Sequence, residues 1–203
     1  MHISEGVLSA PVLIGGAALS AAGLAMGLKK MDYDRLPRVA LLSAVFFVAS
    51  LIHLPVGPSS VHLVLNGLVG LLLGWAAFPA IFVGLTLQAI LFQFGGLTGL
   101  GVNTLSMALP AVLCYYACAP WLRRGRVTLL LASFAAGFGA VLLAALLTAL
   151  SLFLTGEAFL TSAGAIVVAS LPGMIAEGII TTLAVFFLRQ ARPSLLGAEA
   201  GRP

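Results

Sequence analysis

The chain has 203 residues, of which 61% are hydrophobic and only 8% are charged, and its formal net charge is +4. A soluble domain carries about 25% charged residues, so this composition, with a mean hydropathy of +1.16, predicts an integral membrane protein. The ten basic residues fall between apolar runs and not along one face. The positive charge therefore gives no reason to expect a nucleic-acid partner.

The apolar runs predict an all-α, polytopic fold with seven transmembrane helices, and we treat 1–203 as a single transmembrane domain. A span needs roughly 20 mostly apolar residues. Seven segments approach that length: 8–28, 37–54, 61–78, 80–94, 104–121, 128–154 and 163–188. The third and fourth are short, and only Pro79 separates them.

The basic residues predict the orientation of the chain in the membrane. They lie in the connecting segments after the first, fifth and seventh predicted spans. If the chain has seven spans, these three segments are all on the same side of the membrane. The residues are Lys29, Lys30, Arg35, Arg38, Arg123, Arg124, Arg126, Arg189, Arg192 and Arg202. Cytoplasmic loops carry the excess of Lys and Arg. We therefore expect a multi-pass protein of the cell (inner) membrane with a cytoplasmic tail, 189–203, and the N-terminus outside.

The first six residues, Met1-His2-Ile3-Ser4-Glu5-Gly6, are polar for so apolar a chain. A signal peptide opens with basic residues, and here none comes before Lys29, so we expect a terminus that is mature as written. With a free amine, three neighbouring nitrogens are available: the Met1 α-amine, the His2 amide and a His2 ring nitrogen. Because such donors can close fused chelate rings, segment 1–6 is a candidate metal-chelating terminus.

All three histidines fall at the predicted outer end of the bundle: His2 at the terminus, His53 after the second span and His62 before the third. Imidazole is the commonest protein metal ligand, and the Pro- and Gly-containing turn 55–60 would aim His62 inward. Met1, His2 and His62 together form an all-nitrogen set that suits square-planar nickel or copper. The alternative is that these are incidental polar residues at the membrane interface. That interpretation is favoured for His53, whose other possible role is a fourth or outer ligand.

Other polar residues also have two interpretations. Asn66, one turn beyond His62, would either steady that imidazole or bond between helices. The glycine-rich segment 95–103 is predicted as an outer lid with Asn103 at its tip, the alternative being a plain connector. Glu177 lies inside a span, roughly 20 Å below the outer surface. At that depth it is too far away to bind the ion, and we expect a structural hydrogen bond or a partner contact.

The remaining cysteines, glutamines and small residues do not by themselves indicate a function. Cys114 and Cys118, four apart in an apolar run, are predicted to be small buried residues and not a disulfide or zinc pair. Gln88 and Gln93 are polar residues in a predicted span without an assigned role. Small residues at four-residue spacing in the first span would either dock a partner or pack internally: Ala17, Ala21 and Ala25. The chain contains no Walker motif, so we do not expect it to hydrolyse ATP by that machinery.

Three motifs carry a family resemblance: the opening Met-His-Ile-x-Glu-Gly, the sequence Ser60-Val61-His62, and Gly-Gly-Leu-Thr-x-Leu-Gly-x-Asn over 95–103. Together they resemble the cobalt/nickel-specificity membrane subunit (CbiM/NikM-type S component) of energy-coupling-factor ABC transporters, over nearly the whole chain. The resemblance implies a seven-helix fold whose additional N-terminal helix places the start of the chain in a metal pocket. It also implies that the Met1 amine, the His2 amide and ring, and His62 bind the ion.

The resemblance further implies a non-catalytic subunit and its partners. These are a transmembrane coupling subunit, two cytoplasmic ATPases and often a small accessory membrane protein, all within membrane lipid. Apart from the transported Co²⁺ or Ni²⁺, no cofactor is implied, and a cobalt substrate would connect the chain with cobalamin biosynthesis. Cobalt members typically show Ser-His-Pro-Thr, whereas Leu63-Val64 follows His62 here, so the choice between the two metals stays open.

We therefore expect the substrate-capturing subunit of an uptake transporter, and two alternatives are weighed against it. A free-standing secondary carrier of divalent cations would need ionisable residues that relay protons, and only Glu177 is available within a span. An intramembrane metal enzyme would need a base beside the histidines, where the one acid is Glu5 near the terminus.

Overall fold

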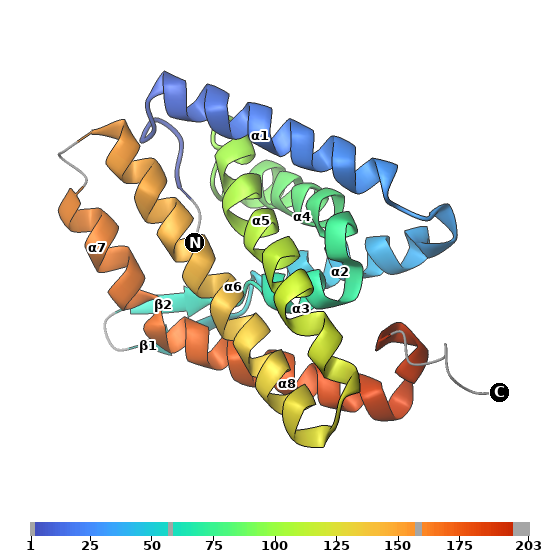
Figure 1. Ribbon diagram of the computed structural model, residues 1–203. Coiled ribbons are helices and arrows are strands. Elements are labelled where there is room, and N and C mark those ends of the chain that lie inside the picture. The colour runs from blue at the N-terminus through green and yellow to red at the C-terminus, as the bar shows by residue number, and fades with distance from the viewer. Residues whose placement is uncertain (1–2, 57–58, 157–159, 197–203) are drawn as a thin grey trace.

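The computed structural model describes residues 3–56, 59–156 and 160–196, and within these ranges the chain forms seven helices and one β-hairpin (Figure 1). One of the seven helices is broken into two segments, α3 and α4. The helices are α1 (Ala10–Lys29), α2 (Leu36–Ala49), α3 (Asn66–Leu73) with α4 (Ala77–Phe92), α5 (Leu100–Cys118), α6 (Arg126–Thr155), α7 (Leu160–Ala169) and α8 (Leu171–Ala191). Strands β1 (His53–Val56) and β2 (Ser59–His62) pair antiparallel, with His53 opposite His62.

The all-helical membrane fold is confirmed, but the described ranges contain fewer full-length spans than the predicted seven. Five stretches in the described ranges are long and apolar enough to cross a membrane: Ala10–Lys29, Asn66–Phe92, Leu100–Arg123, Arg126–Thr155 and Leu171–Ala191. Helix α2 has 14 residues and α7 has 10, which correspond to about 21 Å and 15 Å of helix. Both are shorter than the hydrocarbon core of about 30 Å.

The breaks between helices also differ from those predicted. The third predicted span starts in strand β2 and continues through non-helical residues 63–65, so α3 begins only at Asn66. The break before α4 falls at Gly74, which has φ +56°, and not at Pro79. Pro79 lies in the first turn of α4, where a missing backbone N–H costs no helical hydrogen bond. The seventh predicted span is likewise divided at Ser170, and Pro172 opens α8.

Helix α3 lies in the middle of the bundle, packed against α5, α6 and α8. Glycines permit this close approach: a Cβ at Gly67 or Gly70 would overlap the backbone of α6 or α5, respectively. The side chain of Asn66 donates to the carbonyls of Met107 in α5 and Ala140 in α6, both at 3.3 Å. Asn66 therefore makes the interhelical hydrogen bonds that were one of its two predicted roles.

Helix α1 lies across α4 and α5 at the edge of the bundle (Figure 1). Its buried face is a row of small residues: Gly16, Ser20, Gly23 and Gly27. Ser20 Oγ donates to the Gly101 carbonyl at 2.5 Å, and Gly23 lies against Phe78. The alanines singled out in the sequence, Ala17, Ala21 and Ala25, are exposed. Internal packing is therefore done mainly by the neighbouring row of small residues, to which Ala17 adds a contact with Gly101 of α5.

Candidate metal site

The described start of the chain folds back into the bundle. From the beginning of α1, residues 3–9 return toward α5 and α6 (Figure 1). Ile3 is 5% exposed and packs with Leu8, with Val102 of α5 and with Leu152 of α6. Burial of this apolar side chain draws an otherwise polar terminus into the protein.

Asn103 holds the backbone of Ile3 from both sides. The Ile3 N–H donates to Asn103 Oδ1 at 3.0 Å, and Asn103 Nδ2 donates to the Ile3 carbonyl at 3.2 Å. Because one carboxamide satisfies a donor and an acceptor of the same residue, it fixes both the position and the orientation of this peptide. Ile3 directly follows His2, so Asn103 positions the residue next to the predicted ligands.

The placement of Asn103 corrects one prediction. The predicted lid, 95–103, is shorter in the structure, because α5 begins at Leu100 and the loop between α4 and α5 covers only 93–99. Asn103 thus lies in the first turn of α5 and is 2% exposed, not at the tip of a loop. Its polarity is explained by the contact with the N-terminal segment.

Glu5 fastens the N-terminal segment to the 93–99 loop. Its carboxylate accepts the backbone N–H groups of Leu97, at 2.8 Å, and Thr98, at 3.1 Å. These hydrogen bonds stabilise the charged form, so the pKa of the Glu5 carboxyl lies below its ordinary value. Gly96, at φ +65°, lies against the Glu5 side chain with no room for a Cβ. The sequence interpretation gave Glu5 no such role, although the residue belongs to the opening motif.

Strand β2 ends at His62, and the chain then enters the interior in a non-helical conformation. Leu63, Val64 and Leu65 are buried, and Leu65 has φ +54°. The Glu177 carboxylate accepts the N–H of Val64 and, at 2.9–3.0 Å, that of Leu65. The Glu177 carboxyl group also lies at the N-terminus of α3, an end of the helix at which the dipole favours acceptors.

Glu177 therefore makes the structural hydrogen bond that was expected of it, but it lies nearer to the segment that follows His62 than was predicted. The prediction assumed that a helix runs on from residue 61. Because 59–62 is a strand and 63–65 is irregular, the chain reaches Glu177 only two residues after His62. The acid therefore fixes the segment that follows a predicted ligand.

The predicted ligands are described only in part. Met1 and His2 lie outside the described residues, and the side chain of His53 is likewise not described. The side chain of His62 is half-buried. Within ranges 3–56, 59–156 and 160–196, no group of three or more His, Cys, Asp or Glu side chains lies close enough to hold a metal ion. The structure thus shows the supports of the candidate site, Asn103, Glu5 and Glu177, and not its completed ligand set.

Two large cavities elsewhere are poor sites for a cation. The first, of about 630 Å³, lies between α1, α5 and α6, and its polar side chains are limited to Ser106 and Ser151. The second, of about 890 Å³, is lined by three arginines, Arg35, Arg38 and Arg123, against one acid, Asp34. A divalent cation finds too few ligands in the first and repulsion in the second.

The second cavity belongs to a basic end of the bundle. Arg38 donates to the carbonyl of Leu195 at 2.6 Å, and Arg189 donates to that of Gly125 at 3.1 Å. These contacts join the three segments that carry the Lys and Arg residues, after α1, α5 and α8. Asn103 lies in the first turn of α5, whereas a basic segment follows the last turn of that helix. The basic end and the candidate metal site are therefore at opposite ends of α5.

Comparison with known proteins identifies the family. Residues 2–195 match the family model CbiM, described as the cobalt uptake substrate-specific transmembrane region. A putative metal transport protein of Haemophilus influenzae is 57% identical over 116 residues, or 57% of this chain and 56% of that protein. A fused nickel transport protein NikMN of Rhodobacter capsulatus is 40% identical over 53% of this chain and 33% of its own length. The matched region thus spans about half, or less, of these two relatives.

Longer matches support the same assignment. The cobalt transport protein CbiM of Sorangium cellulosum is 32% identical over 97% of this chain and 94% of that protein. A crystal structure of a transition metal transporter superposes with a TM-score of 0.79 and 29% identity, covering 94% of this chain and 93% of the other. These findings confirm the resemblance carried by the three sequence motifs. The chain belongs to the CbiM family of multi-pass membrane proteins, whose family model is described as a cobalt uptake substrate-specific transmembrane region.

Proposed function

We propose that the chain is the substrate-capturing subunit of an importer for Co²⁺ or Ni²⁺, and that it binds the ion through Met1, His2 and His62. The observation that carries the proposal is the two-sided hydrogen bonding of Ile3 by Asn103. It holds the peptide beside His2 within the bundle and so supports delivery of the terminus to a buried site. The family assignment supports the transported ion.

The donor atoms would be the Met1 amine, the His2 amide, a His2 ring nitrogen and a His62 ring nitrogen. Four nitrogens around an ion suit a square-planar divalent metal. The amide must lose its proton to bind, so affinity falls as pH falls. The position of His62 is supported by Glu177, whose carboxylate accepts the N–H groups of Val64 and Leu65 and so fixes the backbone that follows His62.

In the proposed orientation the N-terminus is outside and the basic end is cytoplasmic. The positive-inside rule supports this assignment, since the described Arg contacts gather the basic segments at one end of the bundle. The loop over 93–99 would then lie at the outer mouth of the site. Its bond to Glu5 suits the predicted lid, because the loop and the N-terminal segment would move together.

Transport would be driven by partners. The sequence contains no Walker motif, so ATP hydrolysis would belong to two cytoplasmic ATPases, coupled through a membrane subunit and accompanied by a small accessory membrane protein. The relative from Rhodobacter capsulatus is a fused nickel transport protein, NikMN, and a fusion of this kind supports assembly with further subunits. A free-standing carrier is less well supported, because Glu177 is the one acid within the described candidate spans and its carboxylate already accepts two backbone N–H groups.

Metal binding by the purified chain tests the proposal. We expect His62→Ala to weaken binding of Co²⁺ and Ni²⁺ by about 100-fold or more, because loss of a direct ligand costs at least as much as loss of an outer partner. His53→Ala is the matched control, since it removes the histidine paired with His62 across the hairpin and should leave affinity unchanged. Isothermal titration with each ion gives both affinities and, by competition, the preferred metal. Unchanged binding by His62→Ala would contradict the proposed ligand set.

Uptake by cells tests the proposed assembly separately. Accumulation of the ion is measured with and without the candidate ATPase subunits. We expect uptake to require them. Uptake at full rate without them would favour a free-standing carrier.

A further inference from the structure

Gln88 is a buried amide whose hydrogen-bonding groups are not used within the described protein. It lies in α4, its side chain is 0% exposed, and neither Oε1 nor Nε2 has a hydrogen-bond partner among the described residues. The hydroxyl of Thr104 in α5 is likewise buried and has no hydrogen-bond partner among the described residues. Burial of an unpaired polar group destabilises a folded protein, so these two side chains call for an explanation.

Both side chains lie at the level of Asn103. Helices α4 and α5 are packed neighbours joined by the 93–99 loop. Gln88 is four residues before the end of α4, and Thr104 is four residues after the start of α5. In an antiparallel pair joined by a short loop, these positions lie at about the same level. Thr104 also directly follows Asn103, which binds Ile3.

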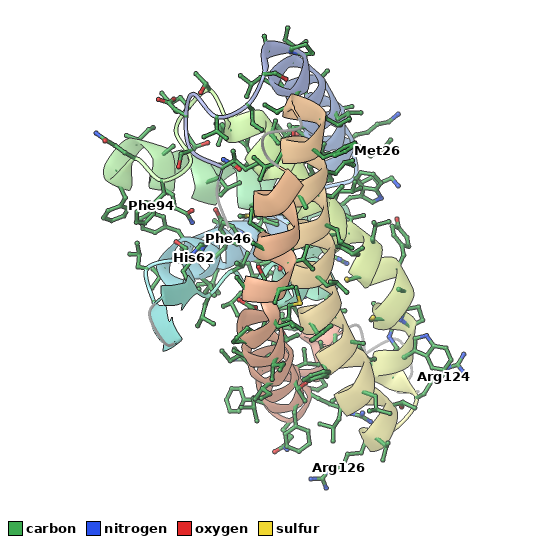
Figure 2. All side chains as sticks on the ribbon, turned by 90° about the vertical axis from the view of Figure 1, so that its left-hand side faces the viewer. Met26, Phe46, His62, Phe94, Arg124 and Arg126 are labelled. Carbon is green, nitrogen blue, oxygen red and sulfur yellow. The ribbon has the colours of Figure 1, made fainter. Side chains whose placement is uncertain are left out.

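The segment that carries His62 reaches the same level from another side. Phe46 of α2 packs against Gly84, one turn before Gln88 on the same face of α4. The chain after α2 continues to Ile52, whose carbonyl accepts the N–H of Leu63 at 3.2 Å. Figure 2, viewed from the left-hand side of Figure 1, labels His62 on the hairpin and Phe46 on α2.

Among the buried amide and carboxylate side chains that the structure describes, Gln88 alone has no hydrogen-bond partner. The structure describes four buried side chains that carry an amide or a carboxylate: Asn66, Gln88, Asn103 and Glu177. Asn66 bonds to α5 and α6, Asn103 bonds to Ile3, and Glu177 bonds to residues 64 and 65. Among these four, only Gln88 has an oxygen without a donor in the described part of the chain.

A metal-bound imidazole needs such an acceptor. A neutral histidine that binds an ion through one ring nitrogen carries a proton on the other, and in metal sites this N–H is normally hydrogen-bonded to an oxygen. We propose that Gln88, with Thr104 beside it, forms the polar inner wall of the metal site, and that Gln88 Oε1 accepts the N–H of a metal-bound histidine. The inference rests on the proposed function and adds a positioning residue to it.

The proposal predicts opposite effects on stability and on binding. Gln88→Met keeps the size of the side chain and removes its unpaired polar atoms, so the metal-free protein should unfold at an equal or higher temperature. Affinity for Ni²⁺ and Co²⁺ should fall by about 10- to 100-fold, the usual effect of losing a partner of a metal ligand. Thr104→Val should change both quantities in the same directions.

The test uses the purified full-length chain in detergent, with thermal unfolding and isothermal titration of each metal. Thr181→Val is the matched control, because Thr181 is equally buried and has no described partner, but lies in α8 beside Gly137. It should alter stability alone. A second control, Gln190→Met, makes the same chemical change at an exposed position of α8 and should alter neither quantity.

The outcomes separate this inference from the proposed function. If Gln88→Met lowers the unfolding temperature and binds metal as tightly as the unaltered chain, Gln88 is structural and the inference is wrong, although Met1, His2 and His62 can still bind the ion. If the unaltered chain binds neither metal, the proposed function itself fails. Weaker binding together with undiminished stability supports the inference.

Discussion

Asn103 is the residue on which the position of the N-terminal segment depends. Its carboxamide makes both described hydrogen bonds to Ile3, in a site where the side chain is almost fully buried. Replacement by Ala would leave the buried N–H and C=O of Ile3 without these partners. The expected loss in free energy of unfolding is about 1–3 kcal/mol.

Hydrogen exchange measures this effect where it occurs. In Asn103→Ala, amide exchange should accelerate in residues 3–9 more than in the rest of the bundle. Asn66→Ala is the control, because its hydrogen bonds join α3 to α5 and α6, so it should destabilise the bundle without a selective effect on 3–9. Equal protection of 3–9 in Asn103→Ala and the unaltered chain would show that other contacts hold the terminus.

Glu5 makes the attachment of the 93–99 loop dependent on pH. Hydrogen bonds from Thr98 and Leu97 place the pKa of its carboxyl below the unfolded value, which is about 4.3. The stabilising contribution is therefore fully present above pH of about 4.3 and is lost as pH falls through the lower, folded pKa. The loop should remain attached from neutral pH to about pH 5.

The pH dependence of loop attachment can be measured by hydrogen exchange of the Leu97 and Thr98 amides. Exchange is followed as a function of pH and corrected for intrinsic rates. We expect protection to decline only in acid, and Glu5→Gln to abolish the decline. A loss of protection between pH 5 and 8 would mean that a different group controls the loop.

At the scale of elements, α3 packs so closely against its neighbours that glycine is required at the contact. Gly70 lies against the backbone of Ala111, where an added Cβ would overlap the carbonyl group. Gly70→Ala should therefore lower the free energy of unfolding by about 1–3 kcal/mol, the usual cost of overpacking. Gly15→Ala provides the comparison, because Gly15 faces open space in α1, and a better helix former there should be neutral or slightly stabilising.

Thermal unfolding in detergent distinguishes the two substitutions. The predicted order of midpoints is Gly15→Ala equal to or above the unaltered chain, and Gly70→Ala clearly below it. Similar midpoints for both variants would show that α3 can shift to admit a methyl group.

Hydropathy predicted the long apolar helices well, because their lipid-facing surfaces make them uniformly apolar. It did not predict the β-hairpin, because the turn at 55–60 was visible in the sequence but hydropathy cannot show that the residues on its two sides pair as strands. The break at Gly74 was missed for a related reason. Its cause is a left-handed backbone conformation, whereas Pro79 attracted attention in the sequence but fits the first turn of α4.

The candidate site was predictable only in part for a similar reason. Its motifs were visible in the sequence, and they led to the correct family. The partners of Asn103, Glu5 and Glu177 were not visible, because each bonds to backbone groups about 90 to 110 residues away in the chain. Sequence reasoning identifies a polar side chain but cannot select its backbone partner.

At the scale of the whole molecule, the two ends of the bundle have different chemistry. One end gathers Arg side chains around a cavity and bonds them to backbone carbonyls. The other holds the N-terminal segment, the 93–99 loop and the His62 hairpin. This asymmetry suits a protein that captures a cation at one end and meets partners at the other.

The central claim is that the free N-terminus of the chain is itself a metal ligand. Metal affinity is therefore measured by titration of Co²⁺ and Ni²⁺ into three purified forms: the unaltered chain, a form with one Gly added before Met1, and a control with one Gly added after Pro203. Addition before Met1 displaces the amine from its place in the chelate ring, so the account predicts a loss of affinity of about 100-fold or more for that form alone. Equal affinity in all three forms would contradict it.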